Sequence, residues 1–165
     1  MHRLHRDRNP SATQGIVAPM TKLADRPRYP IHDLFVRPLV AEQQGAATRL
    51  RLTGHADHLL RRFGHAESIR LPARATFGPL LQTLADEVWV LEEGEAEVFW
   101  RDDRRGSPTS GRHHRLRAVA PLLWLVPFGV AFGLRSVRPC ALLRLSTHEA
   151  NGDQAPPPSP WPEEW

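Results

Sequence analysis

The sequence predicts an all-β protein, built as a sandwich of two sheets or as a closed barrel. Short apolar runs of strand length recur through the middle of the chain and are separated by Gly, Pro and charged residues. Residues 95–101 alternate cleanly, with Ala96, Val98 and Trp100 on one face and charged side chains on the other. Many short, evenly spaced strands without an internal repeat are typical of sandwiches and barrels, including jelly rolls.

The predicted strands follow one another along the core of the chain. They cover residues 34–40, 48–53, 67–71, 87–91, 95–101, 114–119, 122–126, 130–137 and 140–146. Each run is of strand length and is rich in Val, Leu, Ile or aromatic residues, and each is bounded by turn-forming or charged residues. Only residues 58–63 (HLLRRF) favour a helical turn or two.

Two turns have clear chemical causes. In residues 105–111 (RGSPTSG), Pro108 fixes φ near the value that a turn needs, and the flanking glycines relieve the bends. The hydroxyls of Ser107 and Thr109 can cap local backbone groups. Pro127 and Gly129 predict the next hairpin turn. These features predict structure and do not by themselves indicate catalysis.

The ends of the chain differ in composition from the middle. Residues 1–30 are arginine- and proline-rich with few acids, which predicts a disordered basic arm, and Met20 within it is an alternative start to Met1. Residues 155–165 form a Pro-rich, acidic tail that we also expect to be disordered. The remaining residues, 31–154, have the size of one ordinary domain.

Composition narrows the classes of partner. The net charge is +4, but the basic residues of the core are interspersed with acids, so we expect no nucleic-acid partner. The single cysteine, Cys140, excludes an internal disulfide, and its apolar neighbours predict a buried thiol. No run is long enough to cross a bilayer, so we expect a cytoplasmic protein with no membrane partner.

Several motifs resemble those of a known family. Residues 87–94 have the spacing E-x6-G, and Pro127 and Gly129 form P-x-G, as in the two cupin motifs. RRGSPTSGR followed by LWLVPFGVAFG is similar to RxGSPTFGxW and LWIPPGFAHGF of dTDP-4-dehydrorhamnose 3,5-epimerases, and GPLLQ (78–82) stands where they have GLHYQ. Sugar 3,4-ketoisomerases share the DEVW-like and GEAEV-like strands. The resemblance extends over residues 78–147 and implies a single double-stranded β-helix (cupin or jelly-roll barrel), which is usually a homodimer.

The functional positions that the resemblance implies are mostly replaced. The catalytic histidine of the epimerases falls at Leu80, their tyrosine at Arg144, a substrate-contacting lysine at Glu87 and the histidine of the second motif at Phe132. Gln82 is retained. Because the epimerase reaction removes protons next to a ketone and needs a positioned base, these replacements leave open whether the protein is an enzyme.

We expect no metal and no other cofactor. Metal-binding cupins use histidines and a glutamate, of which this chain keeps Glu87 alone, and one carboxylate is too few for a divalent ion. His113 and His114 are adjacent and point to opposite faces of a strand. His65 and Glu67 stand where the epimerases contact substrate, but we expect them to be solvated in a turn. Trp89, Trp100 and Trp124 are predicted to be core residues.

Arg144 is the most unusual of the candidate residues. Alternation over residues 140–148 places Arg144 and His148 on one face, and if that face lines the barrel, Glu87 is the expected partner of Arg144. The guanidinium then either binds an anionic or keto group of a ligand or forms an ion pair that fills the cavity. For an active protein we predict Glu87 as catalytic acid/base, and Gln82, Arg144 and His148 as substrate-binding residues.

Two hypotheses about function follow. In the first, the protein is related to the nucleotide-sugar epimerases and acts as an isomerase on a dTDP-4-keto-6-deoxyhexose. In the second, it is a non-catalytic cupin that binds a small ligand or a protein partner. In both, the expected partners are a small molecule, such as a nucleotide sugar, and a second copy of the chain.

Overall fold

Every regular element that the structure describes is a β-strand. The structure is a computed structural model and describes residues 30–45, 47–53, 59–60, 63–148 and 154–155. The predicted arm and tail therefore lie outside the described residues, except for residues 30 and 155. Within the described residues, no helix is long and apolar enough to span a membrane. The all-β prediction is confirmed.

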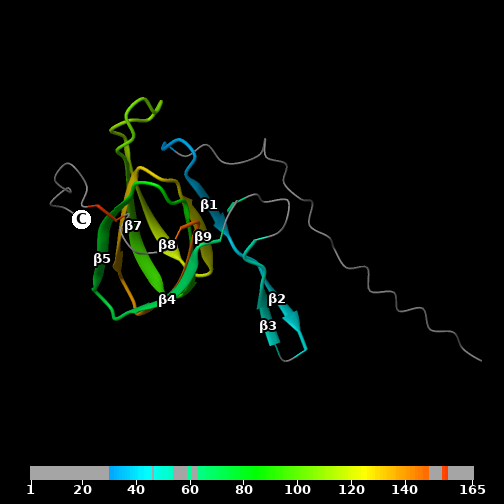
Figure 1. The fold of residues 1–165 in the computed structure, drawn as a ribbon. Helices are drawn as coiled ribbons and strands as arrows, with labels where there is room; N and C mark the ends of the chain where they lie inside the picture. Colours follow the sequence, from blue (N-terminus) through cyan, green and yellow to red (C-terminus); the bar gives the residue numbers. More distant parts are fainter. Residues whose placement is uncertain (1–29, 46, 54–58, 61–62, 149–153, 156–165) are drawn as a thin grey trace, which may run out of the picture.

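Two five-stranded sheets face each other and form a barrel (Figure 1). The first contains, in spatial order, β1 (Phe35–Pro38), β9 (Leu122–Val126), β6 (Glu87–Glu93), β11 (Cys140–Ser146) and β4 (His65–Leu71). The second contains β12 (Gln154–Ala155), β5 (Thr76–Gln82), β10 (Val130–Ser136), β7 (Glu95–Asp102) and β8 (His113–Val119). All of these pairings are antiparallel. This arrangement confirms the predicted jelly-roll barrel.

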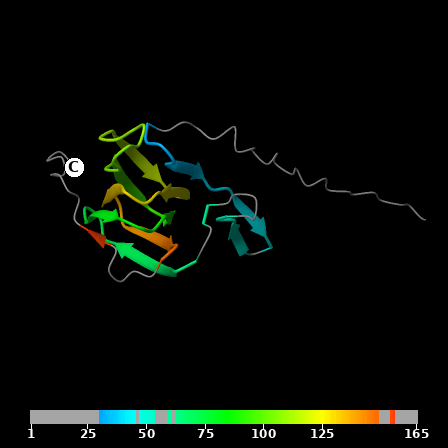
Figure 2. The same ribbon diagram turned by 45° about the horizontal axis from the view of Figure 1, so that its top comes forward.

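A separate two-stranded ribbon stands out from the barrel. It consists of β2 (Ala41–Gln44) and β3 (Ala47–Leu50), and Figure 2 shows it directed away from both sheets. Its residues are almost all exposed. Because β2 reads AEQQ and has Ala41 as its one apolar side chain, the sequence pattern did not predict it.

The predicted strands from residue 87 onward all correspond to observed strands, β6 to β11. The strand β5 was missed because it contains Gly78 and Pro79, which usually end strands. The barrel accommodates them at a bulge, where the register with β10 shifts between Phe132 and Leu134. The helical turn predicted at residues 58–63 is absent from the described residues Leu59, Leu60 and Phe63.

Aromatic side chains fill the middle of the barrel. Trp89 and Trp124 stack with ring centroids 6.4 Å apart, and Trp100 and Phe132 pack against them. All four are at most 2% exposed. The three tryptophans were predicted to be core residues, and this prediction is confirmed. These rings therefore fill the middle layer of the interior and leave no space for a ligand there.

The strand β6 is buried on both of its faces. Its inward residues Trp89 and Leu91 belong to the core cluster, while Val88 and Val90 lie in a second apolar cluster on the outer face of the first sheet. Leu39, Leu59 and other leucines from outside the barrel cover that outer cluster. Double burial fixes the position of β6, and therefore that of Glu87 at its start.

An aspartate anchors the loop after β7. Asp102 is fully buried and accepts hydrogen bonds from the Arg104 guanidinium and from the hydroxyls of Ser107 and Thr109, both at 2.6 Å. Burial, the largest single influence, raises its pKa, but these donors together lower the pKa of Asp102 well below its ordinary value. The SPT sequence of residues 107–109 thus holds the loop that follows β7 in place.

Candidate functional site

Six residues of three neighbouring strands form two rows on the inner face of the first sheet. The register places Ser146 of β11 between Glu87 of β6 and His65 of β4, and one layer deeper it places Arg144 between Trp89 and Glu67. Directly opposed residues of antiparallel strands share a face. Because Trp89 lies in the core, both rows face the interior. We call the end of the barrel where they lie the site end.

The predicted pair of Glu87 and Arg144 is present and almost fully buried. Glu87 is 1% exposed and Arg144 is 3% exposed. Arg144 donates from Nε to Glu87 Oε1 at 3.0 Å and also from Nη2 to the same oxygen. The indole Nε1 of Trp89 donates to Glu87 Oε2 at 2.9 Å. Arg144 Nη1 donates to Glu67 Oε2 at 2.9 Å, so one guanidinium holds two carboxylates.

These bonds leave some capacity for a ligand. A carboxylate offers four lone-pair positions and a guanidinium offers five N–H groups. The three bonds to Glu87 leave one acceptor position, on Oε2, and the three bonds from Arg144 leave two N–H groups. A buried pair that is satisfied in this way is stable in an apolar interior, and removal of one partner is costly.

Gln82 contributes a donor from the opposite sheet. Leu80 lies opposite Phe132, a core residue, so Leu80 and the residue two positions on, Gln82, face the interior. Gln82 is 5% exposed, and its Nε2 has no hydrogen-bond partner among the described residues. Since a buried amide without a partner is destabilising, it indicates a place where a water molecule or ligand atom binds.

His148 follows β11 and reaches the site through its backbone. Its ring Nδ1 lies 3.0 Å from Thr147 Oγ1, and its carbonyl oxygen accepts a 2.6 Å hydrogen bond from His65 Nδ1. His65 Nε2 is 3.6 Å from Glu67 Oε1 and has no hydrogen-bond partner among the described residues. The expectation that His65 and Glu67 are solvated turn residues is wrong, because both lie in β4 with their side chains on its inner face.

The structure thus brings most of the predicted site residues to one end of the barrel. Glu87 and Arg144 are in direct contact, and Gln82 faces the same end from the second sheet. The carbonyl group of His148 accepts a hydrogen bond from His65 at this end. The residue that the sequence analysis undervalued is His65. The alternation His-x-Glu over residues 65–67, at the start of an apolar run, is the signal that could have identified it.

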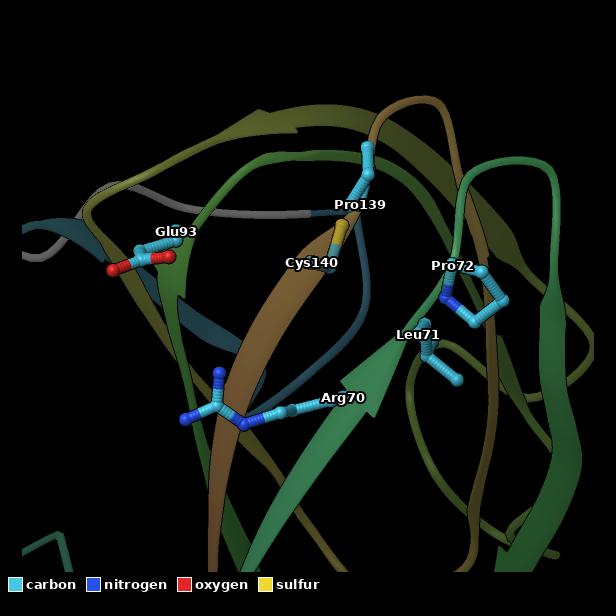
Figure 3. A pocket seen from close by; sticks show the side chains of 6 residues that line it. All are labelled: Arg70, Leu71, Pro72, Glu93, Pro139 and Cys140. Carbon is cyan, nitrogen blue, oxygen red and sulfur yellow. The ribbon is translucent and has the colours of Figure 1, made fainter.

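A pocket of about 290 Å³ lies at the opposite end of the barrel (Figure 3). It is lined by Arg70, Leu71, Pro72, Glu93, Pro139 and Cys140. Cys140 is buried, as predicted, and its thiol donates to the carbonyl oxygens of Glu95 and Arg138. Burial raises the pKa of this thiol, so it is a poor nucleophile. The pocket contains no arrangement for catalysis.

Within the part of the chain that the structure describes, no group of three or more His, Cys, Asp or Glu side chains is placed to hold a metal ion. The carboxylates of Glu87 and Glu67 are instead joined through Arg144, whose positive charge occupies the position between them. The side chains of the site can transfer protons and form hydrogen bonds.

Comparison with known proteins identifies the fold. No family model and no curated protein matches the sequence. Among solved structures, a dTDP sugar isomerase from Desulfovibrio desulfuricans is similar with a TM-score of 0.70 and 19% identity, over 79% of this chain and 88% of that one. A dTDP-4-dehydrorhamnose 3,5-epimerase from Elizabethkingia anophelis has a TM-score of 0.69 and 15% identity, over 79% and 78% of the two chains.

A third similar structure is ChmJ, a 3'-monoepimerase from Streptomyces bikiniensis, solved in complex with dTDP-quinovose. It has a TM-score of 0.68 and 14% identity, over 88% of this chain and 80% of that one. All three likenesses extend over most of both chains at low identity. The protein therefore has the fold of the dTDP-sugar epimerases and isomerases, a double-stranded β-helix of the cupin type.

Proposed function

We propose that this protein is a cupin of the nucleotide-sugar epimerase and isomerase type, which binds a dTDP-4-keto-6-deoxyhexose and moves protons beside its ketone. The observation that carries the proposal is the set of buried polar groups, Glu87, Arg144 and Gln82, at one end of a barrel whose middle layer is aromatic. Support also comes from structures of the same fold that contain dTDP-quinovose and dTDP-4-keto-L-rhamnose.

The proposed chemistry uses the acidity of the C–H bonds next to the C4 ketone. Glu87 accepts a proton at the remaining position on Oε2, and the C–H electron pair becomes the C=C bond of an enolate, with negative charge on O4. The free N–H groups of Arg144 and Gln82 stabilise that charge, and His148 adjoins the sugar at the end of β11, where its carbonyl group holds the His65 ring. Return of a proton to the opposite face of the same carbon gives the epimer. Transfer of the O3 hydroxyl proton to O4, with return of the carbon proton at C4, gives the isomeric 3-ketone.

A second candidate function is a non-catalytic cupin that binds the same class of ligand or a protein partner. It is favoured by the replacement of the epimerase histidine by Leu80 and by the three donors that already bind Glu87. Phe132 and Leu142, both at most 2% exposed, also fill the interior beside the site.

Proton NMR in deuterated buffer tests the first candidate. With dTDP-4-keto-6-deoxyglucose, we expect the C3 or C5 proton signal to disappear in the presence of the protein. dTDP-glucose is the matched control, because without a ketone its C–H protons are not acidic and its signals stay. Unchanged signals with the keto sugar at high protein concentration contradict the enzymatic function. Calorimetric binding of the same sugar without exchange then supports the second candidate.

We further propose that the protein is cytoplasmic and that it is a homodimer, the latter as the resemblance to the epimerases implies. Light scattering of the purified protein is expected to give twice the 18.7 kDa mass of one chain. A mass of 18.7 kDa that does not change with concentration contradicts the dimer.

A further inference from the structure

We propose that His65 is a second acid/base residue of this site and supplies the imidazole that is absent at Leu80. This inference rests on the proposed function, because it assigns a catalytic role within the same proton-transfer reaction. His65 opens β4 and lies in the same inward-facing row as Glu87, with Ser146 between them. Adjacent strands are about 4.8 Å apart, so the backbones of β4 and β6 are about 10 Å apart.

The hydrogen bond to His148 fixes which ring nitrogen carries the proton. A backbone carbonyl oxygen can only accept a hydrogen bond, so the 2.6 Å contact requires a proton on His65 Nδ1. In the neutral ring, Nε2 then has a free lone pair, and this nitrogen has no hydrogen-bond partner among the described residues. Nε2 is therefore the basic atom, held in one orientation by a contact on the far side of the ring.

The carboxylate of Glu67 is positioned to stabilise the positively charged form of the His65 ring. Glu67 Oε1 lies 3.6 Å from His65 Nε2, while Oε2 of the same residue is held by Arg144. When Nε2 takes a proton, Glu67 offsets the positive charge of the imidazolium. Because Arg144 also binds Glu87, the two acid/base groups are joined by one continuous set of ion pairs.

The side chains of His65 and Glu67 are less buried than that of Glu87, although the Nε2 atom of His65 is itself buried. The His65 side chain is 17% exposed and that of Glu67 is 38% exposed, whereas the Glu87 side chain is only 2% exposed. A sugar that enters from the site end therefore meets His65 and Glu67 before Glu87. Gly64 permits this arrangement, because a Cβ at that position would lie 2.3 Å from the His148 carbonyl carbon.

The reaction itself needs two groups that handle protons. Epimerisation removes a proton from one face of the sugar carbon and returns one to the other face, and ketone isomerisation removes and returns protons at neighbouring carbons. A single carboxylate on one side of the sugar ring cannot deliver a proton to the opposite face, as epimerisation requires. With His65 and Glu87 on opposite sides of Ser146, one group removes the proton as the enolate forms, and the other donates a proton as the enolate reverts to a ketone.

The test compares His65→Gln with His113→Gln, a matched change at an exposed histidine of β8 whose ring stacks on Phe99. Glutamine keeps an N–H that can donate to the His148 carbonyl but has no basic nitrogen. We expect His65→Gln to lower the rate of proton exchange with dTDP-4-keto-6-deoxyglucose at least ~100-fold. The Kd for that sugar is expected to stay within a few-fold, and His113→Gln is expected to exchange like the wild type.

Three results overturn the inference, and they are distinguishable. If the wild type and His65→Gln exchange protons at equal rates, the role of His65 is wrong and the proposed function is unaffected. If the wild type does not exchange protons, both the role of His65 and the proposed function are wrong. Nitrogen-15 NMR gives a readout that does not depend on activity: we expect the neutral His65 ring to carry its proton on Nδ1. Observation of the Nε2–H form contradicts the assignment even if the variant is inactive.

Discussion

At the scale of single residues, the most unusual feature of the molecule is the buried guanidinium of Arg144. A guanidinium inside an apolar barrel is stable only because Glu87 and Glu67 accept its hydrogen bonds and Trp89 lies beneath it, with the ring centroid 5.6 Å from Cζ. The same bonds orient Glu87, so stability and the proposed chemistry depend on the same contacts.

Replacement of Arg144 by Met is therefore expected to be strongly destabilising. It leaves Glu87 buried without its cation, and we expect a loss of about 3–5 kcal/mol in the free energy of unfolding. Urea denaturation measures this loss. The control is Arg135→Met, which removes a partly exposed ion pair with Glu97 and should cost less than about 1 kcal/mol. Equal losses in the two variants would contradict a buried pair.

A second residue, Asp102, predicts how stability depends on pH. Its pKa is lower in the folded protein than in the unfolded chain, where an aspartate titrates near pH 4. A group whose pKa falls on folding stabilises the protein above the unfolded pKa, and this contribution is lost as the pH falls towards the folded pKa. We expect Asp102→Asn to be less stable than the wild type at pH 7, with the difference decreasing steadily below pH ~4. Thermal unfolding across this range measures it, and a pH-independent difference would contradict it.

At the scale of elements, β6 holds the site in place because it is covered on both faces. Its outward residue Val90 is fully buried beneath the segment that follows β1, although outward residues of a barrel usually meet solvent. The same covering explains why the apolar run of β6 is continuous and does not alternate.

Val90→Thr tests this covering. The substitution keeps the shape of the side chain and places a hydroxyl in an apolar cluster, so we expect a loss of about 1–3 kcal/mol in the free energy of unfolding. Val119→Thr, at a position of β8 that is 60% exposed, is the matched control and should change stability by less than about 0.5 kcal/mol. If Val90→Thr is as mild as the control, the outer face of β6 is open to solvent.

At the scale of the whole molecule, the two ends of the barrel have different characters. The site end brings together the start of β4, the end of β5, the start of β6 and the end of β11, and with them the polar groups of the proposed site. The opposite end has a small pocket lined in part by Cys140, whose thiol is hydrogen-bonded to backbone carbonyl groups. Between them the aromatic core is closed, so the proposed chemistry is confined to one end.

The sequence by itself determined the all-β class and the buried tryptophans, which follow from period-2 alternation and apolar flanking residues along single strands. It also predicted Glu87 as the partner of Arg144 if that face lines the barrel, from the need of a buried charge for a partner and from the motif position of Glu87. The resemblance to the epimerases also located the loss of their imidazole at Leu80. The strand β5 was missed because Gly78 and Pro79 hide it locally, and only its pairing with β10 makes it a strand.

Only the tertiary structure decided how the His65 ring is held. Its partner is a carbonyl group 83 residues away, and its approach depends on a glycine that fits against the same backbone. The lone pair on its Nε2 follows from that contact and not from the neighbours of His65 in the sequence. Alternation assigns a side chain to a face, whereas the register between distant strands decides which groups meet there, and that register is set by packing across the whole barrel.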